Sequence, residues 1–141
     1  MLESIKKYFL VKEIKSKDGE LHFRRYLLLN AYFFNIYLHR IYKHDYDMHS
    51  HNHAFDFLSF ILGGSYYEEF QGKIYLRDKF SIKRYGSKDY HKLIKLVDDQ
   101  TVTTIALTWN RMKDYKWGYL VNGEHVDFET YRKKKNNKEL N

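Results

Sequence analysis

The chain has 141 residues, of which 43% are hydrophobic and 18% aromatic, and its formal net charge is +7 at neutral pH. This length fits one domain with a sizeable core, and the hydrophobic content excludes a disordered chain. There is no cysteine, which excludes both a disulfide and a thiolate metal ligand. No apolar run reaches the roughly 18 residues of a membrane-spanning helix, and residues 1–10 lack the pattern of a secretory signal. We therefore expect a cytoplasmic protein with no membrane partner.

The positive charge is concentrated at the C-terminal end of the sequence. Residues 132–141 carry five basic side chains and one acidic side chain, so they contribute +4 of the +7. A basic run at a terminus is most often a solvated tail. We therefore assign residues 1–131 to one folded domain and residues 132–141 to a basic tail, and we do not expect a nucleic-acid partner.

Short segments of alternating or apolar character follow one another along the chain, separated by turn residues. Asn122-Gly123 is the strongest of several hairpin signals. Residues 55–62 are almost continuously apolar, which predicts a strand covered on both faces. Regularly spaced short strands are typical of an all-β sandwich or small barrel. The predicted strands cover residues 8–15, 21–29, 32–42, 55–62, 66–70, 73–76, 80–85, 90–97, 101–109, 117–121 and 124–128, and a short helix is predicted at 129–135.

Four of the eight histidines lie between residues 44 and 53. On an extended strand, residues i and i+2 share a face about 6.6 Å apart, so two such imidazoles can converge on one metal ion. A third imidazole two residues further on would be about 13 Å from the first. The pair is therefore either His49 with His51 or His51 with His53. His91 on a distant strand and the nearby Asp56 complete a donor set that suits Fe(II), Mn(II), Ni(II), Zn(II) or Cu(II).

This segment resembles the first sequence motif of the cupin superfamily, and it does so in two registers. In one, His49-Ser50-His51 is followed at the motif's spacing by an acid and a glycine, with aspartate in place of the usual glutamate and no leading glycine. In the other, residues 51–57 (HNHAFDF) and the run after them are similar to small uncharacterised cupin-like proteins of phages and bacteria. The second cupin motif is matched only by His91, with Gly86 five residues before it. After the histidines, the residues that match the motif in one register or the other are Asp56, Ser59, Ile61, Leu62, Gly63, Gly64 and Tyr66.

The resemblance covers about residues 32–128 and implies a cupin-type double-stranded β-helix, that is, a jelly-roll barrel with a divalent metal ion at its mouth. It favours His51, His53 and His91 as metal ligands. Asp56 would be a fourth ligand or an acceptor for the second ring N–H of a ligand histidine, and His49 is the substitute ligand. The expected metal is Fe(II), Mn(II), Ni(II) or Zn(II), and the expected assembly is a homodimer.

Candidate substrate-binding residues lie on both sides of the histidine segment. Arg40 and Arg111 could grip an anionic substrate bidentately, although an ordinary salt bridge is the alternative for each. Tyr66 and Glu68 follow the turn at 63–64 and could line the pocket or lie outside it. His39 and His125 are expected on the surface, and His44 in a solvated loop.

Three functions are consistent with these residues. The first is a divalent-metal-dependent enzyme, oxygenase-like, that acts on a small polar substrate. The second is an isomerase or epimerase of sugar-like substrates. The third is a non-catalytic module that binds a small ligand. One barrel can host unrelated reactions, so the resemblance alone does not decide among them.

Overall fold

The computed structural model describes residues 9–45 and 47–140, and within them eleven strands follow one another before the C-terminal helix α2. The predicted strands are all present, and their described ends differ from the prediction by at most two residues. The all-β prediction is therefore confirmed. The strands are β1 (Leu10–Lys15), β2 (Leu21–Asn30), β3 (Phe34–Ile41), β4 (Asp56–Gly63), β5 (Tyr66–Phe70), β6 (Lys73–Arg77), β7 (Ile82–Tyr85), β8 (His91–Leu96), β9 (Val102–Trp109), β10 (Gly118–Val121) and β11 (Glu124–Asp127).

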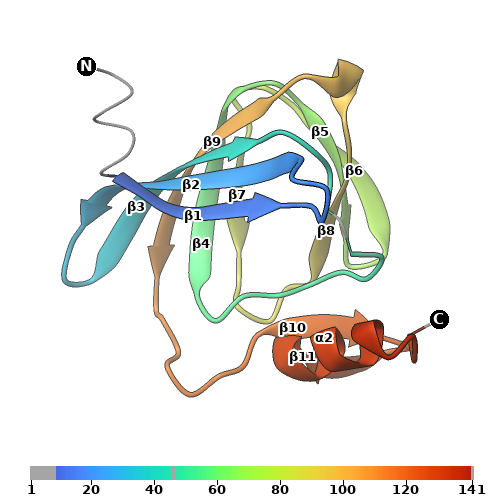
Figure 1. Cartoon of the computed structure of the whole chain (residues 1–141). Coiled ribbons are helices and arrows are strands. Elements are labelled where there is room, and N and C mark those ends of the chain that lie inside the picture. The colour runs from blue at the N-terminus through green and yellow to red at the C-terminus, as the bar shows by residue number, and fades with distance from the viewer. Residues whose placement is uncertain (1–8, 46, 141) are drawn as a thin grey trace.

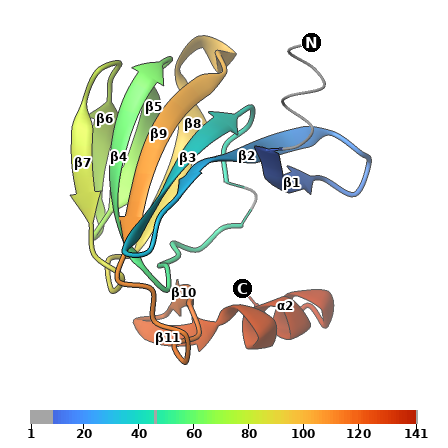
Figure 2. The same cartoon turned by 90° about the vertical axis from the view of Figure 1, so that its left-hand side faces the viewer.

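The strands form two facing layers of antiparallel sheet. The larger sheet has the order β1-β2-β3-β9-β4-β7, and the smaller has the order β6-β5-β8. Figures 1 and 2 show the two layers side by side, with the β10–β11 hairpin and α2 beneath their lower end. Because the chain crosses between the layers from β4 to β5, from β6 to β7, from β7 to β8 and from β8 to β9, this is the jelly-roll arrangement that the resemblance implied.

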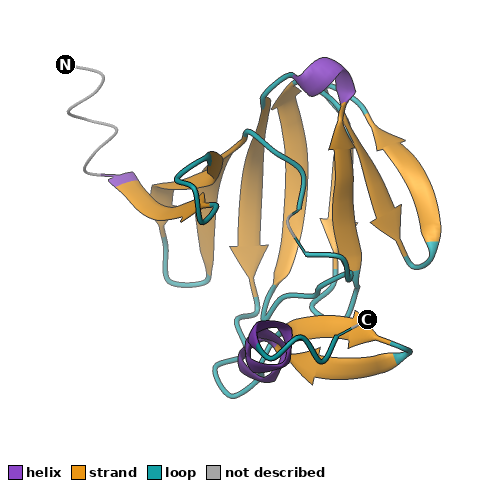
Figure 3. Cartoon of the chain, turned by 45° about the vertical axis from the view of Figure 1, so that its right-hand side comes forward, coloured by secondary structure: helices purple, strands orange, loops and turns teal. Residues whose placement is uncertain are grey.

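A short segment that carries His51 and His53 forms backbone hydrogen bonds with the smaller sheet on one side and with the C-terminal hairpin on the other. The backbone of His51 exchanges two hydrogen bonds of 2.9 Å with that of His91, which begins β8. On the other side of the segment, the N–H of Asn52 donates to Gly118 O, and the N–H of Leu120 donates to Ser50 O. Figure 3 shows this loop between β8 and the β10–β11 hairpin. The segment thus acts as an additional strand, which fixes its register against β8.

The hydrophobic core lies between the sheets, towards the end away from the hairpin. It contains Ile61, Tyr66, Leu93, Leu96 and Val102, and each is less than 9% exposed. Burial of one such aliphatic or aromatic side chain is worth about 1.5–3 kcal/mol, so this cluster is sufficient to hold the two layers together at that end. The buried polar residues Ser59 and Thr104 line a cavity between the layers.

Strand β4 is covered on one face, so the prediction of a strand covered on both faces was wrong. Phe57, Ser59 and Ile61 are buried, whereas Leu58 and Phe60 are half-buried on the outer side of the large sheet. The physical reason is that β4 lies inside the larger sheet, between β9 and β7, and the smaller sheet packs against only one of its faces. Leu58 and Phe60 on the other face are therefore only half-buried.

Helix α2 (Phe128–Asn136) confirms the predicted C-terminal helix and takes in residues 132–136 of the stretch predicted as tail. Asp127 begins it as N-cap, accepting a hydrogen bond from the Thr130 N–H, and a run of lysines at its last turn suits the helix dipole. Tyr131 is buried and stacks on Tyr119 at a ring-centroid distance of 3.8 Å, which fastens the helix to β10. In the described part of the chain, no helix has the length and apolar character needed to cross a membrane.

Candidate metal centre

Three histidines from two distant parts of the sequence meet inside the jelly roll. His51, His53 and His91 each offer one ring nitrogen, and these atoms all lie within 4.8 Å of one another. The Nε2 atoms of His53 and His91 are 3.0 Å apart. The convergence follows from the backbone, because directly paired residues of an antiparallel ladder point their side chains to the same face. Of the two histidine pairs that the sequence left open, the structure brings His51 and His53 together with His91.

The geometry and the protonation state of this cluster both fit a metal ion. Two nitrogens bound to one ion at about 2.1 Å and at a right angle are about 3.0 Å apart, which is the separation of His53 and His91. Burial lowers the pKa of His51 to about 4, although the charge of Asp45 opposes the shift. Burial and the neighbouring histidines hold the pKa of His53 well below its ordinary value. Neutral imidazoles are the form that binds metal, so the lowered pKa values of His51 and His53 favour binding of a divalent ion at neutral pH.

The buried ion pair between Glu68 and Arg77 orients the ring of His91. The Nδ1 of His91 lies 2.9 Å from Oε1 of Glu68, and the other carboxylate oxygen of Glu68 accepts a 2.6 Å hydrogen bond from Arg77 Nε. Burial alone would raise the pKa of Glu68, but the hydrogen bonds from His91 and Arg77 outweigh it and hold that pKa below its ordinary value. The ionised carboxylate keeps the proton of His91 on Nδ1, so Nε2 presents its lone pair to the metal position. Glu68, predicted to contact substrate, is fully buried and supports His91 instead.

An aromatic surface closes the space behind the histidines. The rings of Phe57 and Tyr85 stack at 4.5 Å, and they lie 5.0 Å from His53 and 4.9 Å from His91 respectively. Tyr66, the other residue predicted after the turn at 63–64, lines the same cavity, and burial raises the pKa of its hydroxyl above the ordinary value. These rings form an apolar part of the cavity wall beside the cluster, which lowers the local polarity and strengthens electrostatic interactions there.

The structure does not bring Asp56 or His49 to the cluster. The two carboxylate oxygens of Asp56 accept hydrogen bonds from the Ser87 N–H at 2.8 Å and from Asn110 Nδ2 at 3.1 Å, so this side chain ties two loops to the start of β4. The Nδ1 of His49 lies 2.8 Å from the Tyr131 hydroxyl of α2. Both residues therefore have structural contacts away from the metal position.

The two predicted substrate arginines lie on opposite sides of the large sheet. Arg111 lines the cavity that contains the histidines. Arg40 donates a 2.9 Å hydrogen bond to Thr103 Oγ1 and lies in register with Arg24 of β2, on the outer face, so it does not reach the cavity. The alternation of β3 is the reason, because His39 and Arg40 must face opposite sides of the sheet.

The cavity measures about 430 Å³, and part of its lining was not predicted from the sequence. His39, expected on the surface, lines it, and burial, with the charges of Arg25 and Lys12 adding to the effect, lowers its pKa to about 3. Arg25 and Lys12 line it as well. The alternation of β3 was the available signal, since it places Tyr37 and His39 on the face opposite Arg40. His125 is exposed, as predicted, and His44 is exposed at the cavity edge.

No protein-family model and no curated protein sequence matches the chain. Solved structures do match it. A cupin-2 domain protein from Rhodospirillum rubrum aligns with a TM-score of 0.60 and 8% identity over 90% of this chain and 82% of that protein. A candidate mannose-6-phosphate isomerase from Ralstonia eutropha aligns with a TM-score of 0.57 and 11% identity, over 62% and 84% of the two chains. The Fe(II) form of HppE aligns with a TM-score of 0.57 and 14% identity over 70% of this chain, which spans 56% of that protein.

These likenesses establish the architecture. The chain has the cupin fold, as its sequence motif indicated, and a cluster of three histidines lies within that fold. At identities of 8–14% they establish the fold alone. The chemistry must be argued from the residues in the cavity.

Proposed function

We propose that this chain is a metal-dependent enzyme that holds one divalent ion with His51, His53 and His91 and acts on a small polar substrate. The observation that carries the proposal is the convergence of the three imidazoles on one point, with His91 fixed in the required tautomer by Glu68. Such a donor set leaves further coordination positions to water and substrate. A metal held in this way supplies Lewis-acid chemistry or activates a small molecule.

The residues around the cluster have separate tasks in this proposal. Glu68 and Arg77 hold His91 rigidly, so the metal position is formed before any ion binds. Phe57 and Tyr85 form an apolar part of the cavity wall beside the cluster, and the cavity of about 430 Å³ leaves room for a substrate of modest size. Orientation of a reactant beside a prearranged site is a major source of enzymatic rate enhancement.

Fe(II), Mn(II), Ni(II) and Zn(II) are the candidate metals, because all accept imidazole ligands. An oxygenase-like reaction with Fe(II) is the first choice, supported by the structural likeness to the Fe(II) form of HppE and by the open positions that three protein ligands leave.

Metal analysis of the purified chain tests the proposal directly. We expect about one divalent ion per chain in the wild type and a loss of at least tenfold in metal affinity for His51→Ala. His125→Ala is the matched control, because His125 is exposed and contacts Tyr90 and the backbone of Lys116. His49→Ala should retain the metal. Unchanged metal binding by His51→Ala would contradict the proposal.

An isomerase of sugar-like substrates is the second candidate. The likeness to the candidate mannose-6-phosphate isomerase, which this chain matches over 84% of that protein's length, favours it. An isomerase needs no dioxygen, so turnover that is equal in air and under nitrogen would select it over an oxygenase. Metal and ligand binding without turnover in either atmosphere would select a non-catalytic binding module.

We also propose that the chain forms a homodimer. Support comes from apolar side chains at one edge of the molecule, on β6, β7 and their connection, where Ile74, Phe80 and Ile82 are each more than 60% exposed. Apolar side chains gathered in this way are typical of protein interfaces. Sedimentation of the wild type at several concentrations tests the proposal, and Ile82→Lys should shift the equilibrium towards the monomer.

A further inference from the structure

The cavity that contains the three histidines has a second, basic side. A lysine and two arginines line it there: Lys12 from β1, Arg25 from β2, and Arg111 from the segment after β9. None of the three makes an ion pair with a carboxylate in the described chain. Lys43, a fourth cation at the cavity, is different, because its Nζ is 3.1 Å from Glu20.

The carboxylates that line the cavity are engaged elsewhere. Asp45 accepts a 2.7 Å hydrogen bond from the Leu93 N–H, and Asp47 accepts one of 2.8 Å from the Tyr119 hydroxyl and another from Lys135. They belong to the end formed by β8, β10 and α2. The basic side therefore has an excess of positive charge that the described protein does not neutralise.

The positions of Lys12 and Arg25 are set by strand register. Lys12 lies directly opposite Arg25 in the β1–β2 ladder, and Arg25 lies directly opposite His39 in the β2–β3 ladder. Like charges in directly opposed positions are destabilising. A sheet that places two cations side by side on the wall of a cavity carries a cost that a bound anion would offset.

Arg25 is also held in one orientation. Its Nε donates a 3.0 Å hydrogen bond to Nε2 of His39, and the guanidinium carbon lies 5.1 Å from the ring centroid of Tyr37 and 5.7 Å from that of Phe23. Its outer nitrogens have no hydrogen-bond partner among the described residues. A fixed guanidinium with free N–H groups is suited to bidentate contact with a carboxylate or phosphate group.

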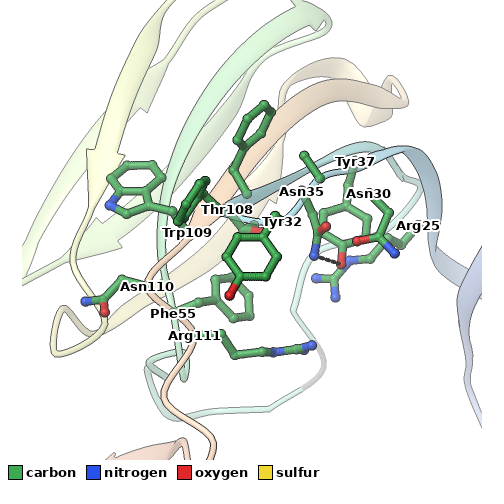
Figure 4. Close-up of a pocket in the computed structure, with 13 residues that line it drawn as sticks. Arg25, Asn30, Tyr32, Asn35, Tyr37, Phe55, Thr108, Trp109, Asn110 and Arg111 are labelled. Atoms are coloured by element: carbon green, nitrogen blue, oxygen red, sulfur yellow. Dashed lines mark hydrogen bonds between the residues drawn. The ribbon is translucent and has the colours of Figure 1, made fainter.

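Arg25 and Arg111 separate this cavity from a neighbouring one. Both arginines and Phe55 also line a second cavity of about 400 Å³, whose polar residues include Asn30 and Asn35. Figure 4 shows Arg25 and Arg111 reaching towards the same region from β2 and from the segment after β9. In that cavity the buried Oδ1 of Asn35 has no hydrogen-bond partner, so a polar group of a ligand could be accommodated beyond the arginines.

We propose that Lys12, Arg25 and Arg111 form an anion site that takes the carboxylate or phosphate group of the substrate, while another polar group of the same molecule faces His51, His53 and His91. The substrate class is thus a small organic anion with a second polar function. The second contact rests on the proposed metal-dependent function, but the anion site does not require the metal and can be tested without it.

The test uses metal-free protein and two simple probes, acetate and inorganic phosphate, at constant ionic strength. Binding is followed by NMR through the arginine side-chain Nε–H signals and the backbone amides of β1 and β2. We expect saturable binding of at least one probe by the wild type, at least tenfold weaker binding by both Arg25→Met and Arg111→Met, and no binding of acetamide, the uncharged analogue of acetate. The probe that binds more tightly identifies the anionic group.

Arg40→Met is the matched control, because Arg40 lies on the outer face of the same sheet. The affinity of this variant for each probe should equal that of the wild type. Binding by Arg111→Met that equals the wild type overturns the proposal, as does the absence of saturable binding of both probes. Should Arg25→Met fail to fold, Arg111→Met in the exposed segment decides alone. Metal content is measured separately on the same proteins, so a failure of the metal proposal and a failure of the anion site are distinguished.

Discussion

The two sides of the central cavity are built on opposite principles. On the histidine wall, formed by His51, His53 and His91, a polar side chain is supported from behind by a charged partner, as Glu68 supports His91. On the cationic wall, formed by Lys12, Arg25 and Arg111, charges of the same sign face one another and no described carboxylate pairs with them. Under our two proposals, the first wall takes a metal ion and the second takes an anion.

The difference indicates where each wall obtains its stability. Paired buried charges are costly to separate, so the histidine wall should lose stability when a supporting residue is changed. Opposed like charges repel, so the cationic wall should gain stability when one charge is removed. The predictions below test this contrast, beginning with the largest expected effect.

Glu68→Gln should break the support of the histidine wall. It leaves the largely buried guanidinium of Arg77 without its ionic partner and removes the acceptor that fixes the tautomer of His91. We expect a loss of about 3–5 kcal/mol in the free energy of unfolding of the metal-free protein and a 10–100-fold loss of metal affinity. Glu69→Gln on the same strand is the control for urea unfolding and metal titration. Equal effects of the two substitutions would refute the supporting role.

The stability of the metal-free protein should fall in acid partly because of His39. Burial, Arg25 and Lys12 lower its pKa from 6.5 to about 3, so between these values the unfolded chain binds a proton that the folded protein does not. Stability contributed by this group is therefore present above pH 6.5 and is lost as the pH falls, by up to about 1.4 kcal/mol per pH unit. His39→Gln keeps a hydrogen-bond acceptor for Arg25 and should flatten the dependence. Unfolding curves at pH 7, 5.5 and 4 measure this, and a slope that does not change would exclude His39 as a cause.

Asn52→Leu should weaken the join between the histidine segment and the C-terminal hairpin. Asn52 is fully buried, its Oδ1 accepts from the Gly118 N–H at 2.9 Å, and its Nδ2 donates to the Tyr115 hydroxyl at 2.6 Å. The substitution leaves the Gly118 N–H without this acceptor, which costs about 1–3 kcal/mol. Tyr115→Phe removes only one of the bonds and should cost less in the same thermal unfolding experiment. A larger effect for Tyr115→Phe would contradict this assignment.

Lys12→Met should act in the opposite direction. Removal of one of two opposed cations is expected to raise the free energy of unfolding of the metal-free protein by about 0.2–1 kcal/mol. The same substitution should weaken anion binding, so stability and affinity move in opposite senses. Lys15→Met is the control on the same strand, because the Nζ of Lys15 is 3.1 Å from Glu13. Lys15→Met loses an ion pair and should not gain stability. If Lys12→Met also loses stability, to a similar extent, the contrast between the two walls is refuted.

The prediction from sequence was accurate where the signal was local. Strand positions follow from alternation and turn residues a few positions apart, so the ends of β5, for example, were predicted to the residue. The short spacing of the histidines limited the possible ligand pair to His49 with His51 or His51 with His53. The apolar run of β4 misled because Leu58 and Phe60 on its outer face are apolar although they are only half-buried.

The rest of the site depends on contacts between residues far apart in the chain. Glu68 was taken for a pocket residue because the sequence did not show that β5 pairs with β8 and places it behind His91. Arg40 was predicted to contact substrate and Arg25 was not, because only the ladders of β1, β2 and β3 show which arginine faces inward. Asp56 lies near the histidines in sequence, yet its hydrogen bonds direct it towards Ser87 and Asn110.

The sequence by itself therefore determined the all-β architecture and the segment that carries the histidines, because both are encoded by short-range periodicity and spacing. The tertiary structure alone decided which histidine pair meets His91, which carboxylate supports it, and which cations face it across the cavity. These are matters of strand pairing and register, and a shift of one residue in register turns every side chain of a strand to the other face.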